Sequence, residues 1–88
     1  MSMGTIANNL PGSECVPGDV LHLRDELPDL DLEAGYYVLL EVIGYYAAIC
    51  PAGEDEADGT LCRAGERITI PSADLEEFVG IGVRVAVE

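Results

Sequence analysis

The sequence predicts a small, mainly β domain, and three observations support that prediction. Its 88 residues are enough for one modest core and too few for two domains. Hydrophobic residues make up 49% of the chain, so it can fold despite a formal net charge of -13. Short apolar runs rich in β-branched and aromatic residues are separated by Gly, Pro and Asp turns, and no run has the period of a long amphipathic helix.

The first predicted elements are an arm, a strand and a loop. Residues 1–18 predict an N-terminal arm or linker because Pro-Gly pairs indicate turns there, and the folded domain is predicted to span residues 19–88. A half-buried strand opens the domain, with Leu21 and Leu23 on one face. The acidic loop that follows, residues 25–35, carries three leucines able to fold it back against the body.

The middle of the chain favours β structure. Residues 36–43 and 45–50 are dense in β-branched, aromatic and aliphatic side chains, and Gly44 separates them. This pattern predicts either two strands joined by a tight turn or one strand bent at the glycine. Residues 51–59 predict a second acidic loop, and residues 60–70 predict a hairpin or a long bent strand.

The C-terminal residues predict one helical turn and then a closing strand. Ser72 is placed to cap a single turn that reaches Phe78. In residues 79–88, valine and isoleucine at odd positions alternate with Gly, Arg, Ala and Glu, so the odd positions are predicted to face the core. The order of strand, long loop, two strands, hairpin, helical turn and last strand is that of a small SH3-like, partly open barrel.

Several short motifs are spread over roughly residues 18–78: Gly18-Asp19-Val20-Leu21, Leu23, Glu26-Leu27-Pro28-Asp29, Leu32, Gly35, Leu40-Glu41-Val42 and Ile70-Pro71-Ser72-Ala73-Asp74-Leu75. Together they resemble a group of small bacterial domains of unknown function, whose pattern is a strand, an acidic Leu-Pro turn, a glycine, a Val-Glu-Val strand and a late Leu-Pro segment. The resemblance implies an SH3-like barrel and carries no activity. Tyr36, Tyr37 and Val38 depart from the pattern, because the family has a further glycine there.

Charge limits the possible partners. Seventeen acidic residues oppose four basic ones, and all four basic residues are arginines: Arg24, Arg63, Arg67 and Arg84. Four arginines are too few to neutralise a row of phosphates. We therefore expect no direct nucleic-acid binding. The apolar runs are too short to cross a bilayer, and the N-terminus lacks a secretory signal, which predicts a cytoplasmic protein without a membrane partner. Three irregularly spaced cysteines fit the same compartment as reduced thiols.

The sequence predicts no catalytic, cofactor-binding or metal-binding residue, and hence no enzyme. His22 has no nucleophile motif near it, and the cysteines lack the close spacing of a zinc site. Cys50 and Cys62 flank the second acidic loop and would form a cross-strand disulfide only if their strands paired under oxidation; buried thiols are the simpler prediction. The acidic runs lack the calcium-loop pattern, and no glycine-rich phosphate loop is present.

We therefore expect a non-enzymatic protein interaction module that forms a homo-oligomer. The tyrosines occur as two pairs on adjacent predicted strands, and alternation places one member of each pair outward. Outward tyrosines beside the apolar Leu39 and Ile43 would form a docking patch, the alternative being ordinary cross-strand packing. The predicted interaction residues are Tyr36, Tyr37, Tyr45, Tyr46 and Ile43.

The acid excess has two readings. Salt adaptation or solubility explains it without a specific role. The alternative function is an inhibitor that mimics nucleic acid and occupies the site of a nucleic-acid-binding protein, and any partner other than a second copy should be basic. The residues of this acidic surface are Asp25, Glu26, Asp29, Asp31, Glu33, Glu54, Asp55, Glu56 and Asp58.

Overall fold

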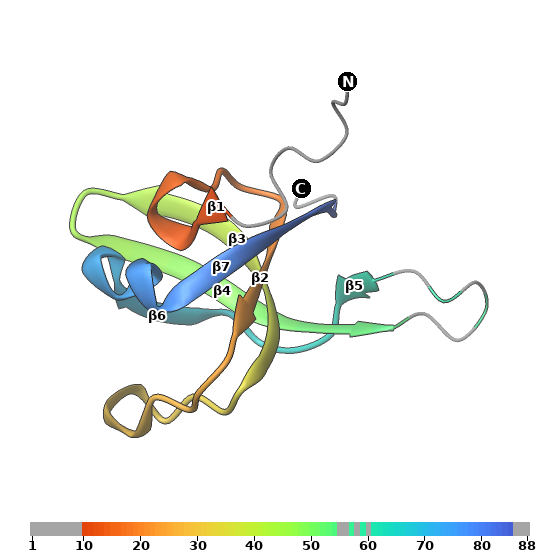
Figure 1. The fold of residues 1–88 in the computed structure, drawn as a ribbon, viewed down its shortest axis with the longest axis horizontal. Coiled ribbons are helices and arrows are strands. Elements are labelled where there is room, and N and C mark those ends of the chain that lie inside the picture. Colours follow the sequence, from red (N-terminus) through yellow and green to blue (C-terminus); the bar gives the residue numbers. More distant parts are fainter. Residues whose placement is uncertain (1–9, 55–56, 58, 60, 86–88) are drawn as a thin grey trace.

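A computed structural model describes residues 10–54, 57, 59 and 61–85 of the chain. The fold is mainly β: one antiparallel sheet that does not close, with 3-10 helices between some strands (Figure 1). The strands are β1 Leu10–Pro11, β2 Asp19–Leu23, β3 Gly35–Ile43, β4 Tyr46–Glu54, β5 Leu61–Arg63, β6 Ile68–Pro71 and β7 Phe78–Arg84, and the 3-10 helices are η2 Gly12–Glu14, η3 Pro28–Leu30 and η4 Ser72–Glu77. The predicted class, mainly β and partly open with a helical turn before the last strand, is confirmed.

The strands lie in the order β1-β7-β2-β3-β4-β5, and β6 also pairs with β4. β5 and β6 share one edge of β4, because β5 pairs with Ala52–Glu54 and β6 with Tyr46–Ile49. The predicted hairpin is therefore wrong, and in place of one long bent strand the segment forms two short strands that run in the same direction along β4. Between them, the Ala64 N–H donates to the Pro51 carbonyl oxygen over 2.9 Å. β4 also runs past Cys50 to Glu54, further than predicted, because β5 supplies a pairing partner.

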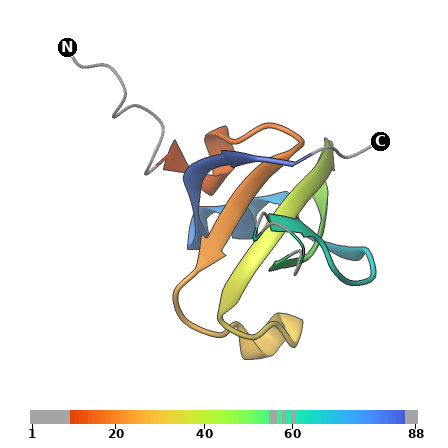
Figure 2. The ribbon, with the colours of Figure 1, turned by 90° about the vertical axis from the view of Figure 1, so that its right-hand side faces the viewer.

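The sheet curls around a main core (Figure 2). Alternate residues of β2, β3 and β4 point into this core, as strand geometry requires. Leu32 is buried against it, and Leu27 and Leu30 pack there partly buried, so the acidic loop does fold back on the body. The buried residues of the main core are Cys15, Leu21, Leu23, Leu32, Tyr37, Leu39, Ala47, Ile49, Ile70, Leu75 and Phe78.

A second apolar cluster covers the other face of the same strands. Val20, Val38 and Cys50 are buried in it, and partly buried residues pack around them: Leu40, Ala52, Leu61, Ile81 and Val85. Apolar contacts on both faces of β3 explain its unbroken apolar run, since a strand buried on two sides loses the alternation of a half-exposed one.

The prediction for the inward face of the last strand is right in part: Ile81 and Val85 pack on the second cluster, but none of the described odd positions lies in the main core. Phe78 is fully buried in the main core, whereas Val83 is 40% exposed and Ile81 packs on the second cluster. The reason is a close approach at Gly80, where an added Cβ would lie 2.6 Å from the Cys15 sulfur. The glycine side of β7 thus faces the segment that precedes β2. Val87 lies outside the described residues.

The described part of the predicted arm packs on the sheet. β1 pairs with β7, with Leu10 opposite Gly80. Gly18 donates its N–H to the Leu39 carbonyl oxygen over 2.8 Å and accepts from the Val85 N–H over 2.7 Å. Residues 10–18 therefore extend the sheet and fill the core ahead of the predicted domain start. The remainder of the predicted arm, residues 1–9, lies outside the described residues.

Candidate docking surface

A tight hairpin joins β3 and β4. Ile43 and Tyr46 are register partners, which leaves Gly44 and Tyr45 as the turn. Gly44 has φ +57°, in the left-handed region that glycine tolerates, and Tyr45 is not among the described residues with positive φ. This is the pattern of a type II′ turn, whose twist matches that of the flanking strands. Of the two predictions for this segment, two strands with a tight turn is right.

The tip of this hairpin exposes four large apolar side chains. Val42 is 45% exposed, Ile43 61%, Tyr45 87% and Tyr46 60%. We call these four residues the hairpin tip. The prediction that only one tyrosine of this pair would face outward is wrong, because Tyr45 lies in the turn, where strand alternation does not apply. Val42 was not predicted; its place beside the turn was the available signal.

Helix η4 holds the hairpin tip in place. The Ser72 N–H donates to the Tyr45 carbonyl oxygen over 2.7 Å, and the Ser72 hydroxyl donates to the Gly44 carbonyl oxygen over 3.2 Å. Pro71 is the register partner of Tyr46. The predicted capping role of Ser72 is therefore wrong: η4 has Pro71 at its N-cap, and the serine hydroxyl stabilises the turn instead.

The hairpin tip itself carries no charge. Two acidic segments lie at the other end of the hairpin, and further carboxylates, those of Asp74, Glu76 and Glu77, lie in η4, which begins at the turn-bonded Ser72. No Asp, Glu, Lys or Arg occurs in residues 42–53. Glu41, the residue before the tip, forms an ion pair with Arg67. β3 starts directly after the first acidic loop and β4 ends at Glu54, so both acidic segments lie about 26 Å from the tip when measured along the strands at about 3.3 Å per residue. Figure 1 shows the tip at the left, the first acidic loop at the bottom and the end of β4 at the right.

The first tyrosine pair lies at the far end of β3 and is divided between core and surface. Tyr37 is 6% exposed, and its ring meets Phe78 edge to face with centroids 5.8 Å apart. Its hydroxyl donates to the Glu33 carbonyl oxygen over 2.6 Å, and burial raises the pKa of the phenol. Tyr36 is exposed, and its ring stacks on the His22 ring with the two centroids 4.7 Å apart. The structure thus brings together Ile43, Tyr45 and Tyr46 of the predicted patch and separates the first pair from them.

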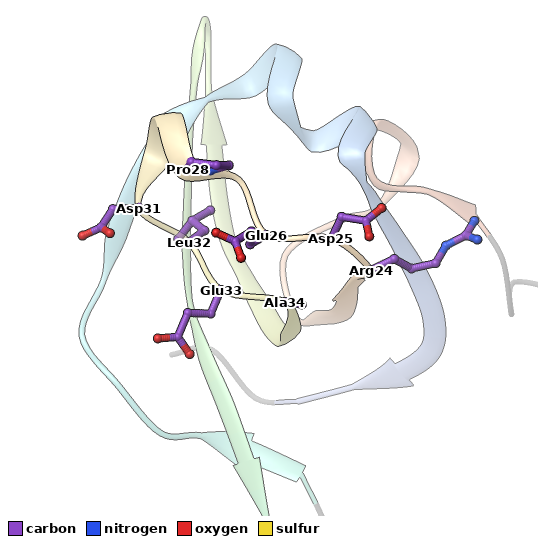
Figure 3. A pocket seen from close by; sticks show the side chains of 8 residues that line it. All are labelled: Arg24, Asp25, Glu26, Pro28, Asp31, Leu32, Glu33 and Ala34. Carbon is purple, nitrogen blue, oxygen red and sulfur yellow. The ribbon is translucent and has the colours of Figure 1, made fainter.

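Four of the five acidic residues of the first loop, all except Asp29, line an open pocket together with Arg24 (Figure 3). The side chains of Asp25 and Asp31 point in opposite directions there, and all five predicted acids of this loop are exposed. Such diverging carboxylates suit a solvated surface. Glu54 is exposed at the end of β4, and Asp55, Glu56 and Asp58 lie outside the described residues. The nucleic-acid-mimicking inhibitor stays a prediction.

The cysteines do not pair. All three are free; Cys62 lies opposite Gly53, and strand alternation then places it on the other face from Cys50. Burial raises the pKa of the Cys15 and Cys50 thiols, and the Asp19 carboxylate adds to the effect at Cys15. Among the residues that the structure describes, no three His, Cys, Asp or Glu side chains gather closely enough to hold a metal ion.

No protein-family model matches the chain, and neither the curated proteins nor the solved structures returned a match. The predicted kinship with the bacterial domains of unknown function therefore stays a prediction. Within the described ranges, no helix has the length and apolar character needed to span a membrane.

Proposed function

We propose that this protein is a non-enzymatic interaction module that docks through the hairpin tip. One observation carries the proposal: four large apolar side chains stay exposed within residues 42–46 of a chain with a net charge of -13. Tyrosine and isoleucine supply much of the binding energy where they become buried at an interface, because they bring a large apolar area with few rotatable bonds.

The fixed position of the tip supports the same role. Its backbone is bonded to Ser72 on one side, and Ile43 pairs with Tyr46 across the strands. A surface that is already ordered loses little conformational entropy when a partner binds, so more of the buried area contributes to affinity.

The other candidate groups support binding rather than catalysis. A thiol whose pKa is raised, as in Cys15 and Cys50, stays protonated at neutral pH and is a poor nucleophile. His22 has one ring face against Tyr36. Three free cysteines suit a reducing compartment, which supports a cytoplasmic location as part of the proposal.

Footprinting in the producing cells tests this proposal. Hydroxyl radicals label exposed tyrosines, so the labelling of Tyr45 and Tyr46 can be compared between cells and dilute purified protein. We expect protection of both in cells. Tyr36, which is 47% exposed at the far end of β3, is the internal control and should label equally in both samples. Equal labelling of Tyr45 in cells and in dilute solution would show that the tip is unoccupied and would contradict the proposal.

A further inference from the structure

We infer that the partner of the hairpin tip is a second copy of this chain, which docks tip to tip about a two-fold axis. The inference rests on the proposed function and adds the partner. It follows from the charge distribution, the available area and the shape of the hairpin, each considered below.

The charge distribution favours docking of a second copy at the hairpin tip over docking at the opposite, acidic end of the hairpin. Two bodies of charge -13 repel wherever their carboxylates approach. Because both acidic segments lie about 26 Å from the tip along the strands, tip-to-tip contact keeps those of the two copies well over a Debye length apart at physiological salt, and the carboxylates of η4 supply the residual repulsion. The adjacent Glu41 is neutralised by Arg67. A basic partner would instead be attracted to the acidic end.

The exposed area reaches what a weak dimer needs. A tyrosine side chain buries about 200 Å², so Tyr45 and Tyr46 at 87% and 60% exposure provide roughly 300 Å². With Ile43 and Val42, each copy offers roughly 500 Å², and two copies about 1,000 Å². This is the lower limit for a specific interface, so the dimer should be concentration-dependent and not obligate.

The tip can also complement itself. A two-fold interface uses the same surface on both copies, so each part must suit the part opposite. Ile43 and Tyr46 lie side by side on one face of the hairpin, and Tyr45 projects from the turn. Across the axis, the Tyr45 ring of each copy can pack on Ile43 and Tyr46 of the other, which pairs aromatic with aliphatic surface throughout.

Sedimentation equilibrium of the full chain tests the inference. We expect a monomer–dimer equilibrium whose Kd falls several-fold between about 50 mM and about 500 mM NaCl, because salt screens the residual repulsion. Tyr45→Ser should raise the Kd about tenfold, and Ile43→Ser/Tyr45→Ser further. Tyr36→Ser, the matched control at the far end of β3, should leave it unchanged. Circular dichroism verifies that each variant is folded.

Arg67→Ala provides a second, independent variant. It leaves Glu41 uncompensated beside the tip, so it should weaken the dimer most at low salt and little at high salt. Three results would overturn the inference: a monomer at all concentrations and salts, a dimer indifferent to Tyr45→Ser, or a dimer that weakens as salt rises. A monomer in solution combined with Tyr45 protection in cells would refute the second copy and leave the docking function standing. A monomer in solution without Tyr45 protection in cells would refute both the second copy and the docking function.

Discussion

Single residues decide how the N-terminal segment meets the sheet. Cys15 is 8% exposed, and its sulfur occupies the space that a Cβ on Gly80 would need. The next nearest atom to that Cβ is the Leu10 Cβ at 3.6 Å, an ordinary contact. An added Cβ at Gly80 would therefore overlap only with the Cys15 sulfur, so removing that sulfur by mutation should relieve the overlap.

Gly80→Ala should lower the free energy of unfolding by about 1–3 kcal/mol, the usual cost of overpacking. In the Cys15→Ala background, the same substitution should cost less by about 1 kcal/mol or more, because the colliding sulfur is gone. Urea unfolding of the four proteins in this double-mutant cycle measures the difference. Additive effects would show that Gly80 is not required by Cys15.

The hydroxyl of Tyr37 is a further single-residue determinant, since it donates to the Glu33 carbonyl oxygen. Tyr37→Phe keeps the edge-to-face contact with Phe78 but leaves that carbonyl without this donor, so the free energy of unfolding should fall by about 1 kcal/mol. Tyr36→Phe is the matched control and should change it by less than about 0.5 kcal/mol. Urea denaturation would contradict this account if both variants behaved alike.

At the scale of elements, η4 and the β3–β4 hairpin form one unit. The helix begins at Ser72, and the same residue bonds both carbonyls of the turn. The hairpin tip thus depends on a segment that follows it by more than twenty residues in the chain, since these hydrogen bonds join positions 28 apart for Ser72 and Gly44. A prediction at this scale tests whether η4 orders the tip.

Ser72→Pro should loosen the tip without unfolding the protein. Proline suits the first position of a helix, so the backbone can be retained, but the N–H that donates to Tyr45 is lost, as is the hydroxyl. We expect faster amide hydrogen exchange at Tyr45 and Tyr46 and unchanged exchange in β2. Ser72→Ala, which keeps the N–H, should have the smaller effect. Equal exchange at the tip in Ser72→Pro and the unmodified protein would show that η4 does not hold the turn.

At the scale of the whole molecule, two apolar clusters lie on opposite faces of one thin sheet and bury thiols on both sides. Cys15 belongs to the main core and Cys50 to the second cluster. Burial raises the pKa of both, and of Tyr37. These three groups therefore bind their protons more tightly in the folded protein than in the unfolded chain.

The protein should lose stability in alkaline solution. A group with a raised folded pKa contributes fully below its unfolded pKa, and this contribution is lost as the pH rises through the folded pKa. For these thiols the loss of stability begins at about pH 8.5. Urea midpoints from neutral pH to pH about 10.5, with a reductant present, should fall, and Cys15→Ala/Cys50→Ala should flatten the decline. A decline as steep in that variant would assign it to other groups.

The sequence by itself determined the fold class, most strand positions, a turn or bend at Gly44 and the acidity of the loops, because these depend on local periodicity and turn chemistry. It also predicted that Leu21 and Leu23 face the core, since a single strand alternates in a known way.

Only the tertiary structure decided which face of β7 turns inward, which tyrosines are exposed and whether Cys50 meets Cys62. Each of these depends on register and on segments far apart in the chain: Cys15 beside Gly80, Ser72 beside the turn, and Gly53 opposite Cys62. The alternation of residues along one strand predicts that its two faces differ, but it does not predict which face another part of the chain will cover.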